Sequence, residues 1–459
     1  MTRILPGVEI QVIKEIVPQQ LNPSGVVAMI GTTERGEILT PTHVSSFREF
    51  ADKFGSAKQY SSAGVKQDYT ILEGIKQAFQ NGVFEVVVTA ISGSGGTNAF
   101  LVLKDNENND TVKLISRKHG EEGNSIAVKV DTGLDAEFVS LQVDDGDIIE
   151  MFENLVMKPS DPAYLVDRIN KGSKLLSAEN LHSNAPKNNP ANIQKTNLTL
   201  GTMGTISKED YEAALEKLES DADVDIVVAC EMTSPEIHSL IEAHCTKMSA
   251  NAKNRIGLAT VAKDESIKDI CGRTNVMASD RFVLVAPYGN LGAVAGLISK
   301  LNYFESPTFK PLSGISKLET NYTPSEQMEL LKSGVIPLEA QRGRGIIVVK
   351  GISTSKEQIS VTRIADHSVR GVKNIADLFI GTLNSSSGRI ALKGKITEFL
   401  MRMEREGSIV PSTDGKEPAY LLDVYSSEMD FAQGIVRVDM AVRPVRAMDY
   451  IYATIKVEA

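Results

Sequence analysis

Three short apolar runs decide the fold of this chain: DIVVAC (225–230), RIGLATVA (255–262) and RFVLVA (281–286). Each has the length of a strand and carries apolar residues at successive positions, which is typical of a strand buried on both faces. Apolar residues at helical spacing precede the first run, between Tyr211 and Leu218, and a helix starting at Pro235 is predicted before the second. Strands that alternate with helices predict a parallel sheet with helices on its faces.

The same alternation is present near the start of the chain. VVAMIG (26–31) has the pattern of a strand, and Ser46 with Glu49 three residues later is a capping box that predicts a helix start. Apolar residues at helical spacing from Tyr69 to Phe79 then precede VFEVVVTAI (83–91), another predicted buried strand. We therefore predict one α/β domain that combines residues 21–92 and 201–340.

A different pattern separates these two halves. Residues 93–200 contain short β-type runs, such as AFLVLKD (99–105) and SIAVKVD (125–131), separated by Asn, Asp and Gly turns. They follow the loop SGSGGTN (92–98). The pattern predicts an inserted β-rich outer domain.

The last quarter of the chain, residues 341–459, is predicted to be an α+β domain that begins with the strand IIVVKGI (346–352). A helix is predicted over 390–406, where five apolar residues form one stripe that ends at Gly407. These five are Leu392, Ile396, Phe399, Leu400 and Met403. Residues 436–442 and 450–457 alternate as strands do, and so does the opening segment Gly7–Val17. Strand-like termini are unusual because chain ends fray unless something pairs with them.

Composition excludes several classes of function. The chain has 459 residues, of which 42% are apolar, which is enough for two to four cores. Its net charge of −10 argues against a nucleic-acid partner. Three cysteines favour folding in a reducing compartment, and the N-terminus lacks the pattern of a secretory signal. The uncharged stretch 282–299 contains Pro287 and three glycines, so it predicts a buried strand, turn and helix rather than a membrane span.

No motif predicts catalysis, a cofactor or a metal. The loop 93–98 lacks the third glycine of a dinucleotide fingerprint, and the spacing of Gly388 and Gly394 does not fit a phosphate loop. His238 and His244 are six residues apart on one predicted helix and point in different directions. The acidic run 144–147 is too compact for a calcium loop. An α/β enzyme of the hydrolase type with a β-rich insertion stays open as the alternative, with a site built from residues distant in sequence.

Several segments together resemble the phage tail sheath protein family. They are PGVEI (6–10), GTTERG (31–36), VSSFREFADKFG (44–55), GAVAGLISKLNYFESPTFKPLSG (292–314), GRGIIVVKGIST (343–354) and VRPVRAMDYIYATIKV (442–457). The resemblance implies a structural protein rather than an enzyme. It implies a subtilisin-like, non-catalytic α/β core, and subunits that polymerise as hexameric rings into a helical cylinder around an inner tube and contract. It leaves open whether the particle is a phage, a tailocin or another contractile injection system.

The resemblance also implies roles for both chain ends. The arms would donate strands to neighbouring subunits through Val8, Ile10, Val12 and Ile13, and through Ile451, Ala453, Ile455 and Val457. Either IIVVKG or IVRVDMAV would belong to the receiving sheet. Pro18, Pro23 and Gly25 would form the hinge of the N-terminal arm.

The implied partners are other copies of the chain, the inner tube protein, the baseplate and the tail terminator, with assembly in the bacterial cytoplasm. We expect no cofactor, nucleic acid or membrane in the assembled sheath. The candidates for the contact with the inner tube are Arg389, Lys393, Lys395 and Arg402 around the last helix. A plain solvated helix face is the alternative interpretation of these four residues.

Overall fold

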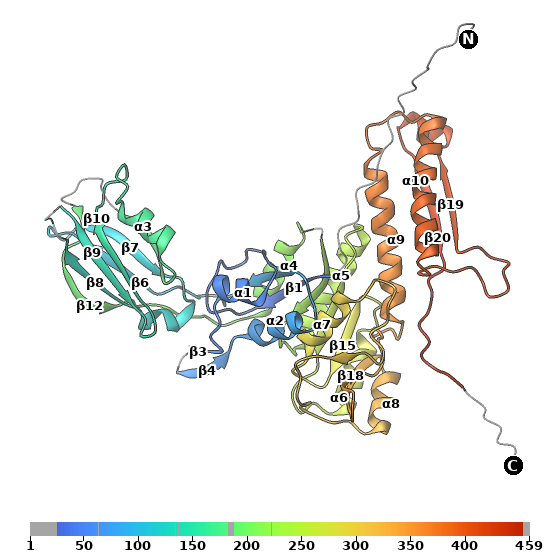
Figure 1. Ribbon diagram of the computed structural model, residues 1–459, viewed down its shortest axis with the longest axis horizontal. Helices are drawn as coiled ribbons and strands as arrows, with labels where there is room; N and C mark the ends of the chain where they lie inside the picture. Colours follow the sequence, from blue (N-terminus) through green and yellow to red (C-terminus); the bar gives the residue numbers. More distant parts are fainter. Residues whose placement is uncertain are drawn as a thin grey trace, which may run out of the picture. The chain divides into compact units, whose positions relative to one another are not determined.

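The computed structural model describes residues 25–62, 64–133, 135, 137–181, 188–221 and 223–452. These residues belong to two compact units (Figure 1). The α/β unit contains residues 25–359 and takes up the chain again at Asp449. The C-terminal unit contains residues 360–448.

A nine-stranded sheet forms the centre of the α/β unit. Its order is β16-β18-β17-β15-β14-β13-β1-β5-β2. Six of its strands run parallel: β1 (Val26–Gly31), β5 (Val86–Ala90), β13 (Val224–Ala229), β14 (Ile256–Thr260), β15 (Phe282–Ala286) and β17 (Val335–Gln341). Three short strands pair antiparallel at its ends: β2 (Thr42–Val44), β16 (Pro311–Leu312) and β18 (Gly345–Val348). The predicted parallel sheet is confirmed.

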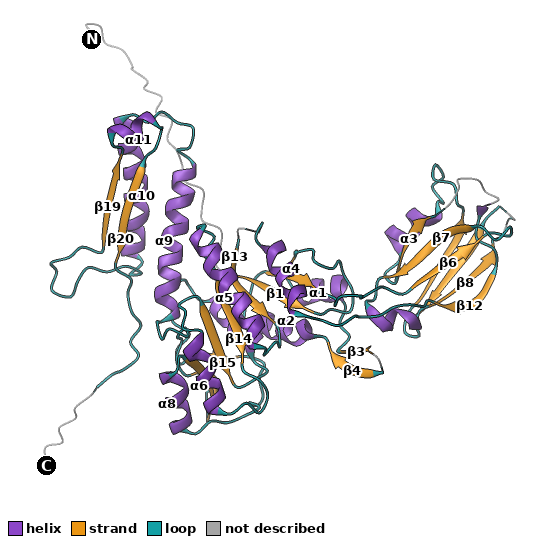
Figure 2. Ribbon diagram, turned by 180° about the vertical axis from the view of Figure 1, so that it is seen from behind, coloured by secondary structure: helices purple, strands orange, loops and turns teal. Residues whose placement is uncertain are grey.

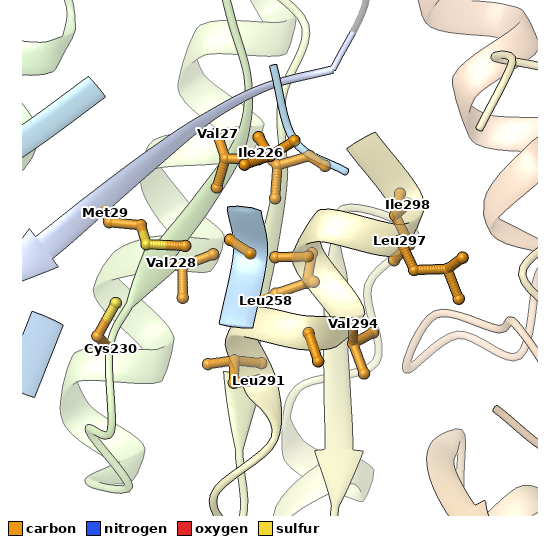
Figure 3. Close-up of a cluster of buried hydrophobic side chains, with 14 of the residues drawn as sticks. Val27, Met29, Ile226, Val228, Cys230, Leu258, Leu291, Val294, Leu297 and Ile298 are labelled. Atoms are coloured by element: carbon orange, nitrogen blue, oxygen red, sulfur yellow. The ribbon is translucent and has the colours of Figure 1, made fainter. Parts of the chain in front are cut away.

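Helices cover both faces of this sheet, because the central strands are apolar on both sides. Along β1, Val27 and Met29 face one core, while Val26, Ala28 and Ile30 face the other. The first core is closed by α1 (Phe47–Phe54), α2 (Thr70–Gln80) and α7 (Leu291–Lys300), and Figure 3 shows α7 side chains against those of β1, β13 and β14. The second core is closed by α4 (Lys208–Leu218), α5 (Pro235–Ala250), α6 (Ile267–Val276) and α8 (Pro324–Lys332). The predicted mixed α/β architecture is confirmed.

The predicted capping box at the start of α1 is only half formed. The Ser46 hydroxyl accepts the backbone N–H of Glu49 at 3.2 Å, as predicted. The Glu49 carboxylate, however, accepts the backbone N–H and the hydroxyl of Ser45, both at 2.8 Å, instead of turning to Ser46. These hydrogen bonds, together with Lys53, lower the pKa of Glu49 to about 2.

The strands between residues 100 and 197 form two antiparallel sheets with their own core. One sheet has the order β10-β9-β8-β12 and the other β11-β7-β6. The strands are β6 (Phe100–Lys104), β7 (Asp110–Ser116), β8 (Ala127–Thr132), β9 (Val139–Asp144), β10 (Ile149–Leu155), β11 (Leu176–Asn180) and β12 (Ile193–Asn197), and the helix α3 (Leu165–Gly172) packs beside them. The loop 93–98 pairs with the returning chain through the bridges Ser94 to Thr205 and Thr97 to Thr202. This glycine-rich loop is therefore a connection, as expected, while the domain boundaries at 93 and 200 stay a prediction.

The C-terminal unit contains two long helices and a β-hairpin. The elements are α9 (Ile359–Asp377), α10 (Ser386–Arg405), β19 (Tyr420–Tyr425), α11 (Glu428–Ala432) and β20 (Arg437–Val442). The predicted helix over 390–406 is α10, and all five residues of its apolar stripe are buried.

One expectation about this unit is wrong. IIVVKGI does not begin the last domain, because β18 pairs with β17 and β16 in the nine-stranded sheet, and the unit boundary falls after Ile359. IIVVKGI carries apolar residues on both faces of the strand. Its sequence alone therefore did not show whether the strand joins the nine-stranded sheet or a sheet of the last domain.

Buried polar side chains in the α/β unit are structural. The Nε2 atom of His238 lies 3.0 Å from the carbonyl oxygen of Met232, and the Nε2 atom of His244 lies 2.8 Å from Nη1 of Arg255. Within the described ranges no group of His, Cys, Asp and Glu side chains could hold a metal ion. No described helix is long and apolar enough to cross a membrane.

Acidification should destabilise the α/β unit through His244. Burial, followed by the charge of Arg255, lowers the pKa of His244 to about 4. The folded chain therefore keeps a neutral imidazole while the unfolded chain takes up a proton near pH 6.5, so this contribution is complete above pH 6.5 and is lost as the pH falls toward 4. We expect His244 alone to lower the free energy of unfolding by about 2 kcal/mol between pH 7 and pH 5. Urea unfolding at both pH values measures this loss.

The matched control for this prediction is His244→Gln. Its side-chain carbonyl can still accept from Arg255 but does not titrate, so the variant should lose less stability between the two pH values. An equal loss in both proteins would show that other groups cause the pH dependence.

Candidate assembly surface

A small sheet of two strands, β19 and β20, lies along α10 in the C-terminal unit (Figure 2). The strands pair antiparallel, with Tyr420 opposite Val442 and Tyr425 opposite Arg437. Six apolar side chains alternate toward the inner face: Tyr420, Leu422, Val424, Val438, Met440 and Val442. Their neighbours in the sequence, including Leu421 and Asp423, are exposed on the outer face. The hairpin is thus half covered, with an apolar face toward the helix.

Both outer edges of this hairpin are open in the described part of the chain, where β19 and β20 pair only with each other. The backbone N–H of Arg443 donates to the carbonyl of Ala419, which fixes the phase of the ladder. In an antiparallel pair, alternate residues turn their N–H and C=O groups away from the partner strand. Those of Leu422 and Met440 therefore point outward. A two-stranded sheet is marginally stable in water, and unpaired edges accept further strands.

Helix α10 packs against the apolar inner face of the hairpin, and its other side packs against α9. The Ser385 hydroxyl caps α10 by accepting the backbone N–H of Gly388 at 3.1 Å. The Phe399 ring of α10 lies 5.6 Å from the ring of His367, and the hydroxyl of Ser368 lies 3.7 Å from the sulfur of Met403. Gly371 of α9 faces the same ring, and a Cβ atom built there would collide with Phe399. The close approach of the two helices requires this glycine.

Substitution of Gly371 with alanine should destabilise the C-terminal unit, although alanine favours helices. The added methyl group must displace the buried Phe399 ring, which we expect to cost about 1–3 kcal/mol. Gly394 is the matched control, because it also lies in a helix and the position of its Cβ is open. Gly394→Ala should stabilise by up to about 1 kcal/mol. Thermal unfolding of both variants tests the contrast, and a lower Tm for Gly394→Ala than for Gly371→Ala would contradict it.

An ion pair closes the end of the hairpin. The Arg437 guanidinium donates to both carboxylate oxygens of Asp430, at 2.8 and 3.0 Å. Asp430 also forms a capping box with Ser427 at the start of α11. The hydrogen bonds from Arg437 and Ser427 lower the pKa of Asp430 to about 2. The turn between β19 and β20 is therefore held by charge as well as by hydrogen bonds.

Large apolar side chains are exposed beside this turn. Ile380 and Leu383, in the connection between α9 and α10, are 80% and 86% exposed. Met429 and Phe431 of α11 are 77% and 59% exposed. The amide of Asn384 donates to Ser426 and to the carbonyl of Ile435, so the two segments are neighbours. Apolar side chains gathered in this way are typical of surfaces that contact other proteins.

Comparison with known proteins finds the same family in one segment of the chain. Residues 204–354 match the model of the phage tail sheath protein central domain. The chain carries a tail sheath domain. The resemblance predicted from the sequence is thereby confirmed.

Two relatives of this chain are tail sheath proteins. The chain is 25% identical over 244 residues to the tail sheath protein of Staphylococcus phage Twort, an alignment that covers 47% of this chain and 41% of the relative. It is 24% identical over 287 residues to the tail sheath protein of Bacillus phage SP01, covering 57% and 47%. The chain thus spans less than half the length of these relatives. They are structural tail proteins and not enzymes.

Solved structures of sheath proteins have the same fold as this chain. The sheath tail protein from Listeria innocua superimposes with a TM-score of 0.67 at 15% identity, over 93% of both chains. The helical sheath of the anti-feeding prophage in the contracted state superimposes with a TM-score of 0.59 at 13% identity, over 99% of both chains. At this identity the likeness establishes the fold alone.

The four residues proposed for the tube contact lie on two faces of α10. Arg389 and Lys393 are four residues apart and share one face, while Lys395 and Arg402 share a nearly opposite face. Arg389 donates to the side chain of Asn384 at 2.7 Å, and Lys393 pairs with Asp423 of β19 at 3.1 Å. Lys395 pairs with Glu398 at 3.3 Å, and Arg402 lies 5.7 Å from the centroid of the Phe399 ring. The structure does not bring the four together, and their role stays a prediction.

Most residues of the predicted arms lie outside the described residues of the chain. These are Val8, Ile10, Val12, Ile13, Pro18 and Pro23 in the N-terminal arm, and Ala453, Ile455 and Val457 in the C-terminal arm. Ile451 is described and is 82% exposed. Gly25 is buried at the start of β1, where its N–H donates to Asp225 and its carbonyl accepts from the Ser299 hydroxyl. Gly25 is therefore the fixed end of the predicted hinge.

Sequence reasoning missed two parts of this surface. Helix α9 was not predicted, and neither was β19, although YLLDVY (420–425) is apolar except at Asp423. A short run rich in apolar, aromatic and β-branched residues is the signal that could have found the strand. The open edges have no signal in the sequence, because they depend on which strands pair.

Proposed function

We propose that this chain is the subunit of a contractile tail sheath, of a phage or of a phage-like injection system. In this proposal the subunits polymerise as hexameric rings into a helical cylinder around an inner tube and contract to drive the tube through a target envelope. The observation that carries the proposal is the β19–β20 hairpin with two open edges, in a chain with a tail sheath domain.

Two arms and two open edges suggest how the lattice is held. We assign Gly7–Val17 and Ile451–Val457 as donor strands, and the β19–β20 hairpin of neighbouring copies as the receiving sheet. The alternative receiver, IIVVKG, is paired on both sides by β16 and β17. Strand addition supplies backbone hydrogen bonds between subunits while the linkers let each subunit pivot. Pro18 and Pro23 form the pivot ahead of Gly25.

Contraction in this scheme needs no nucleotide. An extended lattice that gains contacts on shortening can store the energy, in the way that packed interfaces switch between two arrangements. In this proposal the α/β core has a structural role and no catalytic one. Its fold is then subtilisin-like, without the catalytic chemistry of subtilisin. The partners are then other copies of the chain, the inner tube, the baseplate and the tail terminator, and assembly takes place in the bacterial cytoplasm.

The tube contact is a separate part of the proposal. Arg389 and Lys393 on one face of α10, or Lys395 and Arg402 on the other, would meet an acidic inner tube. Each pair is replaced with Glu in turn. Only one of the two double variants should co-sediment less with the inner tube. Unchanged co-sedimentation for both would leave a solvated helix face as the explanation.

Negative-stain electron microscopy tests the assembly directly. The purified chain is imaged as its concentration and the salt concentration rise, together with a truncated chain that lacks residues 1–20. We expect hollow, striated cylinders from the full chain and folded, unassembled particles from the truncated one. Small closed particles from the full chain, even with its tube present as template, would favour the α/β enzyme instead.

A further inference from the structure

The base of the C-terminal arm contacts the α/β unit at Asp449 and Tyr450. The chain leaves this unit after Ile359 and returns to it at Asp449. The side chain of Asp449 is only 11% exposed, while Met448 before it is 87% exposed and Ile451 after it is 82% exposed. A carboxylate that is buried between exposed apolar neighbours must be held by specific partners, because burying an unpaired charge is costly.

Two side chains of the α/β unit supply those partners. Lys350 lies just after β18, and its Nζ atom is 3.1 Å from Oδ2 of Asp449. The side-chain amide of Gln358 donates to the same oxygen at 2.7 Å. Gln358 is itself fixed, because it is buried and forms a β-bridge with Ile352. Both partners are thus positioned by the α/β unit itself.

Tyr450 extends the same contact by one residue. The Nζ atom of Lys350 lies 5.0 Å from the centroid of the Tyr450 ring and donates to the Tyr450 hydroxyl at 3.3 Å. One ammonium group therefore binds two successive residues of the tail, by an ion pair and by a cation–π contact. Burial lowers the pKa of Lys350, but the hydrogen bonds and charges of Asp449 and Tyr450 outweigh burial and raise it.

This contact differs from an ordinary surface ion pair. Exposed pairs contribute little because water and salt screen them. Here the Lys350 side chain is 22% exposed and the Asp449 side chain 11%, and a neutral amide donates to the carboxylate as well. By contrast, the pair between Lys416 and Asp414 is 83% and 54% exposed, so it serves as a matched comparison within the same chain.

We propose that Lys350 and Gln358 are positioning residues that clamp Asp449 and Tyr450 onto the α/β unit, so that the C-terminal arm departs from a fixed point toward a second copy of this chain. The arm clamp is defined by these four residues. Asp449 is the buried residue of the clamp, since Tyr450, Ile451 and Tyr452 are 70%, 82% and 94% exposed. This proposal rests on the proposed function, in which the C-terminal arm donates a strand. The clamp fixes where the donor strand begins.

Limited chymotrypsin digestion of the unassembled full chain tests the clamp. Cleavage after Tyr452 should be fast in every variant, while cleavage after Tyr450 should be slow as long as the clamp holds. The ratio of the two initial rates, read from intact masses, is the measurement. Lys350→Asp and Asp449→Lys should each raise the relative rate of cleavage after Tyr450 by about ten-fold, because each removes charge-assisted hydrogen bonds.

The reversed pair and a surface control make the test specific. Combining Lys350→Asp with Asp449→Lys should return the ratio to within about two-fold of the wild type, as expected for residues in contact. Lys416→Asp changes the charge equally and should leave the ratio unchanged. Gln358→Ala, which removes a hydrogen bond and no charge, should raise it about three-fold and keeps the test informative if a reversal fails to fold.

Two results would overturn the clamp: single reversals that leave the ratio unchanged, or a double reversal that does not restore it. Neither depends on tubes being formed, because the chain is digested before assembly. A chain that never polymerises would thus refute the proposed function and leave the clamp standing.

Discussion

Replacing Leu422 with proline is expected to stop polymerisation while the chain still folds. The backbone N–H of Leu422 points away from β20, so a proline there removes none of the hydrogen bonds inside the hairpin. It removes a donor that an incoming strand needs, and its ring blocks the approach of that strand. If strand addition holds the lattice, the fraction of chain that sediments as tubes should fall by about ten-fold or more.

Leu422→Val is the matched control, since it keeps the backbone donor and an apolar inner side chain. Met440→Pro makes the same test on the opposite edge of the hairpin. Sedimentation and negative-stain microscopy measure assembly, and circular dichroism confirms that each variant is folded. Normal tubes from both proline variants would show that neither edge receives a strand. A loss from only one of them would assign the donor strand to that edge.

The central sheet could be predicted because its strands are distinctive locally. DIVVAC and RFVLVA are apolar at successive positions, and only a strand covered on both faces makes use of that pattern. The apolar stripe of α10 was also legible, since helical periodicity over three turns leaves one choice of buried face. The local pattern of apolar side chains is therefore sufficient to predict these elements.

Pairing and contacts between distant segments could not be predicted in the same way. β18 has the composition of any buried strand, and its place beside β17 depends on a short turn that brings Gly345 opposite Gln341. The arm clamp joins Lys350 to Tyr450, which is 100 positions further along the chain, and to Asp449 just before it. Such contacts depend on tertiary packing, which local sequence does not encode.

Arg255 is another residue whose role only the structure revealed. Its side chain is fully buried in the α/β unit, which is rare for a charged residue. Nη1 donates to Nε2 of His244, and Nη2 donates to the carbonyls of Leu218 and Asp221 at the end of α4. The last carbonyls of a helix have no partner within the helix, so the guanidinium caps α4 from the neighbouring segment.

Substituting Arg255 with methionine is expected to lower the free energy of unfolding by about 3 kcal/mol or more. Methionine fills part of the volume but removes the guanidinium donor from the carbonyls of Leu218 and Asp221, although the Leu218 carbonyl keeps the backbone N–H of Asp221 at 3.2 Å. The loss of these hydrogen bonds dominates the effect. Arg342→Met is the control, because Arg342 is exposed and its loss should change stability by less than about 0.5 kcal/mol. Urea unfolding at pH 7 compares the two. Equal stabilities would mean that water or a backbone shift replaces the guanidinium, and that the end of α4 does not depend on Arg255.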